Sequence, residues 1–567
     1  MFQHKNIRFV AIVCLILLST QLFSQASRNS GFSKPMNLPF NLAGSFGEPR
    51  KDHFHSGIDI KTNGIEGEPV FAIGDGYISR IRVSPYGYGK AIYITHTNGF
   101  TSVYGHLSKF YGKIEAYIYA QHYLLKNSEL DLTLQANIFP VKQNDTIAFS
   151  GNTGGSDAPH LHFEIRNTKT EHALNPLDFY PKEFYVDTIP PQINKVKVFI
   201  SKDIYENKAI IYSLNKNNNY LTTDNLVKLS DTGVVAFSLE GFDKQDNSEN
   251  KNGIQCIKIL QDEKQIFEYN LGEINFDINK TCNAFIDYNE MLNSNGYFYN
   301  CFRLKENKLT YYSQSNGIFH IKDSIQQFSF LVKDYNHNTV NIKIDVIVEI
   351  PDSVIDSAWE ILENTISKEV KTDNLTVLIN SDFKIIFPIN CFYDDVYIHV
   401  VNLDNQYLVQ HWNHTILPLH KPASIEFKSA IKKNRNKIVI IHQNHKGKET
   451  ALKTTFDKTK FYAATKELGT FYLKYDTTKP VIKIINYELG IINENKSILA
   501  KISDNLSGIS TYNVYIDDKW VNFYYDAKND LLQYNIDENW SKGEHLLKII
   551  VTDNVGNKSI VQQKFTY

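Results

Sequence analysis

The sequence predicts a mainly β chain of several domains, and three observations support this fold class. The chain has 567 residues, which corresponds to roughly 3–5 ordinary domains, and 42% of its residues are hydrophobic. Tyrosine and phenylalanine are abundant, with 34 and 35 residues, which suits half-buried strands. Segments of alternating hydrophobicity recur beside turn-forming Asp, Asn and Gly residues, as in "HLLKIIVTD" (545–553). Antiparallel sheets are therefore expected along most of the chain.

The N-terminus has the pattern of a secretory signal peptide. Lys5 and Arg8 precede the apolar run 9–18, and small residues follow at 24–26. We predict a signal peptide over residues 1–26; the alternative is an uncleaved anchor, for which the run is short. No other span is apparent. The mature chain is therefore expected to be exported, to the periplasm, the cell envelope or the extracellular space, with no transmembrane span.

The net charge indicates which partners the chain is not built to bind, and the cysteine content indicates how many disulfides it could form. The chain has 60 basic and 62 acidic side chains, a formal net charge of -2, so no large field of one sign points to nucleic acid or to an anionic membrane. The mature chain keeps Cys256, Cys282, Cys301 and Cys391. An even number of cysteines in an oxidising compartment allows one or two disulfides, whose pairing the sequence does not define.

An internal repeat organises the C-terminal two thirds. "VDTIPPQINKVKVF" (186–199) parallels "YDTTKPVIKIINYE" (475–488), and "SFLVKDYNHNTVNIK" (329–343) parallels "KIIVTDNVGNKSIVQ" (548–562). Their Asp-x-x-x-Asn turns, which start at Asp334 and Asp553, suggest either calcium binding or the far commoner turn capping. After a 27–185 domain we therefore expect three units: a β-sandwich module with an insertion at 186–351, a β-rich module at 352–474 and an Ig-like β-sandwich at 475–567.

The N-terminal domain is richer in glycine and holds the most closely spaced histidines. "GKAIYITHTNGFTSVYGHLS" (89–108) predicts a hairpin around Asn98-Gly99. Residues 112–127 have apolar positions at helical spacing, which predicts a helical insertion on the surface of the domain.

Two short segments bring together residue types that bind metals. In "HFHSGIDI" (53–60) the Ser-Gly pair favours a loop entering a strand over a helix, so that Asp59 points away from its isoleucine neighbours. In "HLHFEIR" (160–166) the period of two places His160, His162 and Glu164 on one face. Two imidazoles and a carboxylate are a common ligand set for catalytic Zn²⁺, which keeps a fourth position open for water or substrate. His106, in "YGHLS", is close enough in the predicted hairpin to reach the same cleft.

These segments resemble the M23 family of zinc endopeptidases, the lysostaphin-type or LytM-like enzymes that act on bacterial cell walls. The H-x-x-x-D, Y-x-H-L and H-x-H segments occur in the family's order, and "GSFGEPR" (44–50), "GEPVFAIGDGYI" (67–78) and "SGNTGGSDAPHLHFEIRN" (150–167) also resemble it. The resemblance covers about residues 36–185. It implies an antiparallel-sheet peptidase domain. The sequence departs from the family in the stretch of roughly 35 residues after "YGHLS", which is longer than in the compact members.

The resemblance also implies roles for individual residues. It assigns His55, Asp59 and His162 as zinc ligands, His160 as the general base, and His106 as the residue that orients water and stabilises the oxyanion. A structural role for His160 is the alternative.

The other polar residues of these segments have structural interpretations. Glu164 is expected to fix an imidazole rather than to act as a fourth ligand. His96 is expected to be a structural or groove-wall residue, and His53 and His122 to be surface or packing residues.

The function implied is that of an exported zinc metalloendopeptidase that hydrolyses peptide bonds in peptidoglycan stem peptides or cross-links. Its partners would be that peptide substrate and a cell-envelope protein bound by the sandwich modules. One alternative is a non-catalytic regulator that activates a cell-wall amidase, although such members have lost zinc ligands. Another is an adhesin with a structural zinc, which would need a closed site with four ligands.

Overall fold

The computed structural model describes most of the chain. The described residues are 31–200, 209–224, 226–229, 234–294, 296–313, 315–321, 325–348, 364–485, 487–488, 491–492, 497–536 and 540–566. The predicted signal peptide lies outside them. Among the helices within these ranges, none has the length and apolar character needed to cross a membrane.

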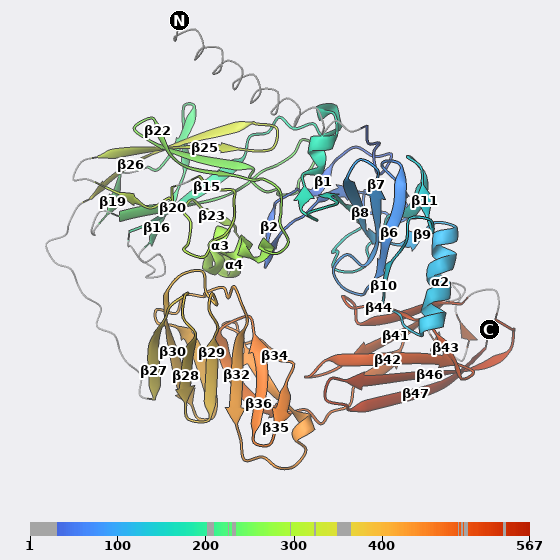
Figure 1. The fold of residues 1–567 in the computed structure, drawn as a ribbon. Helices are drawn as coiled ribbons and strands as arrows, with labels where there is room; N and C mark the ends of the chain where they lie inside the picture. Colours follow the sequence, from blue (N-terminus) through green and yellow to red (C-terminus); the bar gives the residue numbers. More distant parts are fainter. Residues whose placement is uncertain are drawn as a thin grey trace, which may run out of the picture.

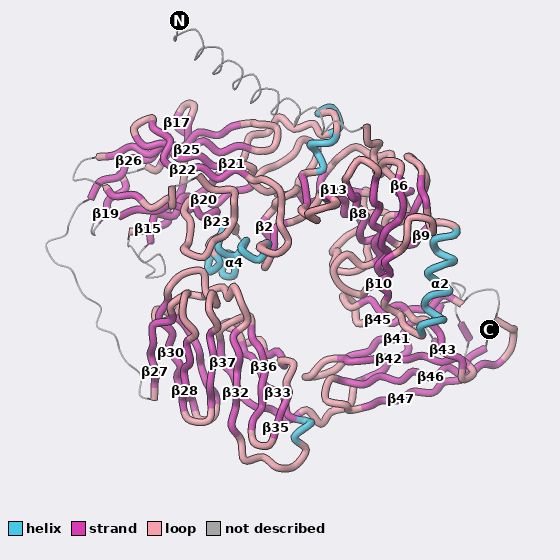
Figure 2. Tube along the Cα trace, in the orientation of Figure 1, coloured by secondary structure: helices cyan, strands magenta, loops and turns pink. Residues whose placement is uncertain are grey.

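The chain follows a ring of four β-rich units, shown as a ribbon in Figure 1 and as a tube in Figure 2. We call them the N-terminal domain (31–185), the first module (186–348), the second module (364–475) and the third module (476–566). Almost all their strand pairs are antiparallel. The prediction of a mainly β chain is confirmed.

The N-terminal domain is built on one nine-stranded sheet, in the order β1-β4-β13-β8-β7-β6-β10, with β11 beside β6 and β14 beside β13. A second sheet, β5-β12-β9, and the pair β2-β3 complete the domain. The strands are β1 (Leu42–Gly44), β2 (Pro49–Arg50), β3 (His53–Phe54), β4 (Ile58–Lys61), β5 (Pro69–Phe71), β6 (Gly76–Val83), β7 (Lys90–His96), β8 (Phe100–Leu107), β9 (Lys109–Phe110), β10 (Leu130–Thr133), β11 (Pro140–Val141), β12 (Thr146–Phe149), β13 (His160–Asn167) and β14 (Ala173–Leu174).

Two local predictions for this domain are confirmed. Strands β7 and β8 form the predicted hairpin around Asn98-Gly99. The predicted helical insertion is α2 (Lys113–Leu125), which runs along the outside of the domain in Figure 1. Its buried face carries Ile114 and Ile118, which pack the helix against the domain. Short 3-10 helices, η1 (Pro176–Phe179) and η2 (Lys182–Phe184), end the domain.

Each module consists of two sheets that enclose a hydrophobic core. The first contains β15 (Gln192–Phe199), β16 (Ala209–Ser213), β17 (Asn215–Asn217), β18 (Tyr220–Thr222), β19 (Val227–Leu229), β20 (Val234–Phe242), β21 (Cys256–Gln261), β22 (Lys264–Asn270), η4 (Asn279–Thr281), α3 (Cys282–Phe285), α4 (Tyr288–Ser294), β23 (Phe298–Asn300), β24 (Phe319–His320), β25 (Gln326–Lys333) and β26 (Thr339–Val348).

The second module contains β27 (Thr365–Val370), β28 (Thr376–Asn380), β29 (Phe383–Phe387), β30 (Val396–Leu403), β31 (Gln406–His411), β32 (Ala423–Lys428), η5 (Arg435–Lys437), β33 (Ile438–Gln443), β34 (Glu449–Ala451), β35 (Thr455–Asp457), β36 (Lys460–Thr465) and β37 (Gly469–Tyr475). The third contains β38 (Val481–Ile484), β39 (Tyr487–Glu488), β40 (Ile491–Ile492), β41 (Ser497–Ser503), β42 (Ile509–Ile516), β43 (Lys519–Val521), β44 (Tyr524–Asp526), β45 (Leu531–Asn535), β46 (Glu544–Asp553) and β47 (Lys558–Thr566).

The internal repeat is visible in the sheet topology of the first and third modules. In the first, β15 pairs with β20, and the facing sheet contains β26-β25-β21-β22. In the third, β38 pairs with β41, and the facing sheet contains β47-β46-β42-β43. The similar sequence segments therefore occupy equivalent strands in both modules.

The N-terminal domain and the first module share one continuous cluster of buried hydrophobic residues. Phe54 beside the metal-binding segment packs on Phe285 and Tyr311 of the first module, with ring centroids 5.3 and 6.1 Å apart. Gly47 lies so close to Leu271 that a Cβ on the glycine would be 2.0 Å from the leucine side chain. These contacts make the first module part of the structural support for the N-terminal domain.

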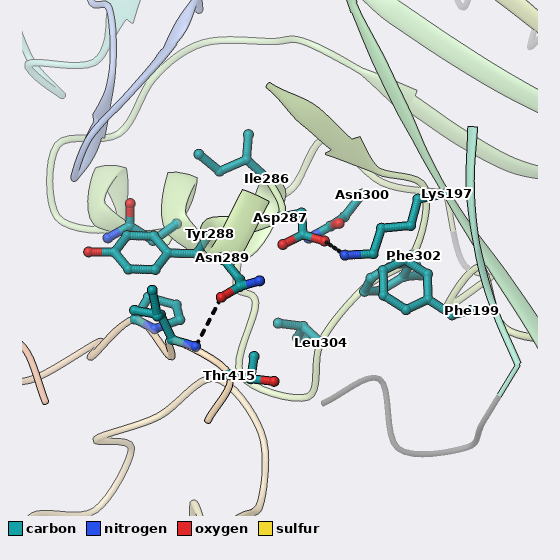
Figure 3. A pocket seen from close by; sticks show the side chains of 13 residues that line it. Lys197, Phe199, Ile286, Asp287, Tyr288, Asn289, Asn300, Phe302, Leu304 and Thr415 are labelled. Carbon is teal, nitrogen blue, oxygen red and sulfur yellow. Dashed lines mark hydrogen bonds and ion pairs between the residues drawn. The ribbon is translucent and has the colours of Figure 1, made fainter. Parts of the chain in front are cut away.

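The contact between the first and second modules is partly apolar, because Tyr393 of the second module packs in a buried cluster with Phe199 and Phe302 of the first. Ile416 donates its backbone N–H to Asn289 Oδ1 at 3.2 Å across this contact, and within the first module Lys197 pairs with Asp287 at 2.7 Å in the pocket drawn in Figure 3. None of the described residues that line this pocket is a histidine or a cysteine. We therefore regard it as part of the module junction.

The third module closes the ring against the N-terminal domain. Trp520 lies edge-on to Tyr123 of α2, with centroids 5.6 Å apart, and Lys528 Nζ donates to the backbone oxygens of Asn152 and Ser156 at 2.6 and 2.7 Å. Figure 1 shows the red third module beside α2. The last module thus contacts the loop that leads into β13.

The four cysteines are free thiols. Cys256, Cys282, Cys301 and Cys391 are all buried, and none forms a disulfide. Burial raises the pKa of the Cys391 thiol to about 12 and that of Cys256 to about 11. None of the disulfides that the sequence allowed is therefore present among the described residues, and the thiols of Cys282, Cys301 and Cys391 donate instead to backbone oxygens.

Candidate metal centre

The central strands of the N-terminal sheet bring the predicted metal-binding residues together. Strand β13 lies between β4 and β8, and His162 pairs in register with Asp59 on β4. His55 comes from the loop that enters β4. This loop lies against β13 at Gly57, where a Cβ would be 2.3 Å from the backbone oxygen of Phe163. A glycine is required at that position for the close approach.

Three donor atoms converge at this point. His55 Nε2 is 3.0 Å from Asp59 Oδ1 and 3.0 Å from His162 Nδ1, and His162 Nδ1 is 2.8 Å from Asp59 Oδ1. All three side chains are buried. A tetrahedral zinc ion with bonds near 2.0–2.1 Å separates its ligand atoms by about 3.3 Å, so a small adjustment of these side chains fits that ion.

The hydrogen bonds around the triad orient each donor toward the others. His55 donates from Nδ1 to the backbone oxygen of Ser45 at 2.8 Å, which leaves the Nε2 lone pair facing the centre. His162 donates from Nε2 to Glu164 Oε1 at 2.8 Å, which leaves Nδ1 facing the centre. Asp59 directs Oδ1 inward, while its Oδ2 accepts from Arg50 at 2.7 Å. Such outer partners are typical of histidine and carboxylate ligands of metals.

Glu164 is the central hydrogen-bond acceptor among the residues that surround the triad. Its side chain is fully buried, and it accepts hydrogen bonds from Ser56, Tyr88 and Arg166 in addition to His162. Burial opposes its ionisation, but Arg166 and His162 outweigh burial and keep the pKa of Glu164 well below its usual value. The expectation that Glu164 fixes an imidazole agrees with these contacts.

The pKa values of His55, His162 and Asp59 indicate which proton a bound metal ion would displace. Burial lowers the pKa of His55 to about 4. Burial also acts to lower the pKa of His162, but the hydrogen bonds with Asp59 and Glu164 raise it to about 9. Asp59 is ionised, since the surrounding imidazoles outweigh its burial and hold its pKa well below the usual range. A bound metal ion would take the place of the proton that His162 holds at neutral pH.

His160 and His106 lie beside the triad and outside it. His160 Nε2 is 3.4 Å from Asp59 Oδ1 and has no hydrogen-bond partner within the described residues, while its Nδ1 donates to the backbone oxygen of Ala158 at 2.8 Å. The rings of His160 and His106 have centroids 4.8 Å apart. His106 donates from Nδ1 to the backbone oxygen of Thr153 at 2.8 Å, and burial lowers its pKa to about 3. Its Nε2 is therefore an acceptor.

The three histidines of this domain that were expected to have structural, surface or groove-wall roles lie outside the triad. His96 is buried under hydrogen bonds with Asp75 and Ser102, and His122 bonds to the backbone of Asn127 at the end of α2. His53 is exposed and lines the groove. Four contributing residues were not identified from the sequence, because their roles depend on contacts with distant strands: Arg50, Ser56, Tyr88 and Arg166.

A groove with a volume of about 830 Å³ leads to the triad. One wall consists of residues of the N-terminal domain, including Tyr88, whose ring stacks on that of His162 with centroids 4.9 Å apart. The first module contributes Asn250 and Tyr297 to the other wall. The shape of the groove therefore depends on two units of the chain.

Comparisons with known proteins agree with the motifs. Residues 53–124 match Peptidase family M23, and residues 367–476 match the Zu5-like domain. An uncharacterized metalloprotease of Haemophilus influenzae is 32% identical over 123 residues, or 22% of this chain and 20% of that protein. The peptidoglycan DD-endopeptidase ShyB of Vibrio cholerae is 29% identical over 136 residues, or 23% and 26%. Lysostaphin of Staphylococcus staphylolyticus is 31% identical over 134 residues, or 23% of each.

Among solved structures, the catalytic domain of lysostaphin from Staphylococcus simulans is 27% identical to this chain, with a TM-score of 0.18, and the match covers 27% of this chain and 93% of that one. The chain spans between 20% and 26% of the length of the three curated relatives above.

The fold and the buried His-Asp-His triad define a domain of the metallopeptidase class. The N-terminal region matches peptidase family M23, so the resemblance carried by its sequence motifs is confirmed. The matched residues end at 124, yet His160 and His162 lie beyond them on β13 and complete the site in the folded sheet.

Replacing Glu164 with glutamine is expected to weaken zinc binding by roughly 10–100-fold, because His162 would lose the charged acceptor that fixes its ring. Competition with a chelator of known zinc affinity measures the change. Glu171→Gln is a matched control, since Glu171 is exposed and lies 3.8 Å from the same Arg166. Equal zinc affinity in both variants would contradict the role of Glu164.

Proposed function

We propose that this chain is an exported zinc metalloendopeptidase that cleaves peptide bonds in peptidoglycan stem peptides or cross-links. The observation that carries the proposal is the orientation of the triad: each histidine donates its outer N–H to an acceptor, and its other ring nitrogen converges with Asp59 Oδ1 on one position. Three ligands of this kind leave a position open for chemistry. The relative ShyB, which is named as a peptidoglycan DD-endopeptidase, supports the substrate class.

His160 is suited to act as the base. When bound, zinc supplies a Lewis acid that polarises the scissile carbonyl and acidifies the attacking water. Because Nδ1 of His160 donates to Ala158, its unpartnered Nε2 holds the lone pair that accepts the proton from water and later returns it to the leaving amine.

His106 is suited to orient that water, because Thr153 fixes its hydrogen on Nδ1 and Nε2 is an acceptor. In this neutral form His106 does not donate from Nε2. Stabilising an oxyanion, the other role that the family resemblance implies, would require it to be protonated.

The modules are proposed to position this domain in the cell envelope, either as spacers or by docking a protein partner. The intact triad and the open groove favour an enzyme over the regulator that activates an amidase.

The test is digestion of purified peptidoglycan and of soluble cross-linked stem peptides by the zinc-loaded chain, with products identified by mass spectrometry. We expect new termini at one peptide bond, and no such products with the His162→Ala variant. A zinc-loaded chain that cuts neither substrate, but stimulates a cell-wall amidase, would overturn the proposal in favour of the regulator.

A further inference from the structure

The two repeated modules place three aspartates at equivalent positions. Asp187 precedes β15, while Asp243 follows β20 and Asp334 follows β25; we call these three residues the first acidic triad. In the third module the same places are taken by Asp476, Asp504 and Asp553. In each set, one carboxylate oxygen from every aspartate lies within 4.8 Å of the others.

The first acidic triad is buried and incompletely bonded. Asp187, Asp243 and Asp334 are 6%, 2% and 1% exposed. Asp187 Oδ2 and Asp243 Oδ1 are buried atoms with no hydrogen-bond partner in the described part of the chain. No lysine or arginine of the described residues forms an ion pair with any of the three. Burying three carboxylates without a counter-charge is costly. Within the part of the chain that the structure describes, the three aspartates therefore lack a positively charged partner that would offset this cost.

The pKa values in the first acidic triad also indicate a missing positive charge. Burial raises the pKa of Asp243 to about 9, with further contributions from Asp187 and Asp334. Burial likewise raises the pKa of Asp187 to about 6. Both shifts reflect the cost of holding negative charges together in a dry site, which a cation would remove.

The surrounding hydrogen bonds hold the carboxylates in place. Asn338 donates its side-chain amide to the backbone oxygen of Asp187 at 3.0 Å and to Asp334 Oδ2 at 2.8 Å. Asn557 makes the equivalent bonds to Asp476 and Asp553, at 3.1 and 2.7 Å. The Asp-x-x-x-Asn turns therefore are capped as the sequence predicted, and capping leaves carboxylate oxygens available to the centre of each cluster.

We propose that the first acidic triad binds a divalent cation of the calcium class. All its donors are oxygens, which a hard cation prefers, and Ca²⁺ accepts 6–8 oxygen ligands in flexible geometry. Two further buried amide oxygens without hydrogen-bond partners, of Asn252 and Asn336, belong to residues bonded to the triad's own backbone. The repeat extends the expectation of a calcium ion to the equivalent triad of the third module.

The position of this site connects it with the metal centre. Asp243 and Asn252 exchange both backbone hydrogen bonds and so close the loop 244–251. That loop bonds to β1: Gln245 Oε1 accepts from Leu42 N at 2.9 Å, and Asn250 Nδ2 donates to the backbone oxygen of Ala43 at 3.1 Å. A cation at the base of the loop would therefore brace one wall of the groove that leads to the histidines.

The test uses the full zinc-loaded chain, titrated with CaCl₂ by calorimetry and followed by hydrogen exchange. We expect Ca²⁺ to bind with a Kd of about 10⁻⁵–10⁻³ M and to slow amide exchange in residues 244–252. Asp243→Asn should weaken this effect at least tenfold, whereas Asp504→Asn, the same change at the equivalent position, should leave the exchange of that loop unaltered. Binding that protects only the third module would overturn the assignment.

Thermal unfolding gives a second readout that does not depend on activity. Without a cation, Asp243→Asn removes one of three crowded carboxylates and should leave the melting temperature equal or higher. In 5 mM CaCl₂, a concentration of about five times the weakest expected Kd, the variant should melt below the unsubstituted chain. A variant that is more stable in both conditions, together with no heat of Ca²⁺ binding, would show that the triad binds no cation. Asp187→Asn replaces Asp243→Asn if the latter does not fold.

Discussion

Substitution of His162 by alanine is expected to abolish stoichiometric zinc binding and with it all measurable peptidase activity. The unsubstituted chain should hold about one zinc ion in the triad, and loss of the His162 Nδ1 donor leaves only His55 and Asp59. Two protein ligands do not retain zinc against dialysis. Metal analysis of the dialysed variant, together with its thermal unfolding, separates loss of the ion from loss of the fold.

The control for this experiment is His122→Ala, which removes another buried histidine of the same domain. His122 lies on α2, and its ring bonds to the backbone of Asn127 and not to the groove. This variant should keep its zinc. Full zinc occupancy in the His162→Ala chain would show that the converging donors are not the metal site.

The second large effect is expected from His160→Ala, which should keep the zinc ion and lose activity by on the order of 10²–10⁴-fold. The reason is geometric: the converging donors are His55, Asp59 and His162, whereas His160 lies beside them with an Nε2 that has no hydrogen-bond partner in the described structure. The measurement is the turnover rate on a soluble stem peptide, with zinc content determined on the same sample.

His172→Ala is the matched control for His160, because His172 follows the same strand, β13, but bonds to Glu273 outside the groove. Its activity should stay close to that of the unsubstituted chain. If zinc and activity are lost together in His160→Ala, then His160 is a ligand, and the roles of the two histidines in "HLH" must be exchanged.

Local patterns accounted for the elements that carry the site. The alternation in "HLHFEIR" predicted a strand, and β13 (His160–Asn167) is that strand. The Asn98-Gly99 turn and the helical spacing after residue 112 predicted the hairpin and α2. These features depend on interactions between residues near one another in the chain, so a single sequence expresses them directly.

Local patterns could not predict the residues that contact the metal ligands and the groove from distant parts of the chain. Arg50 ends the short strand β2, and only the tertiary placement of β2 beside β4 brings its side chain to 2.7 Å from Asp59. The groove wall formed by Asn250 comes from a separate module, about 200 residues further along the chain. The cysteines illustrate the same limit, because their even number allowed disulfides, while all four are buried free thiols in the folded chain.

The sequence by itself determined the mainly β class, the exact order of the metal-binding motifs and the repeat of two modules, since periodicity and motif spacing are properties of short segments. Tertiary structure decided which nitrogen of each histidine faces the metal, how the first module completes the groove, and that the repeated aspartates cluster in a buried site. These outcomes depend on which distant strands pair and on which side chains lose their contact with water. Both are set by the packing of the whole chain and not by any one segment.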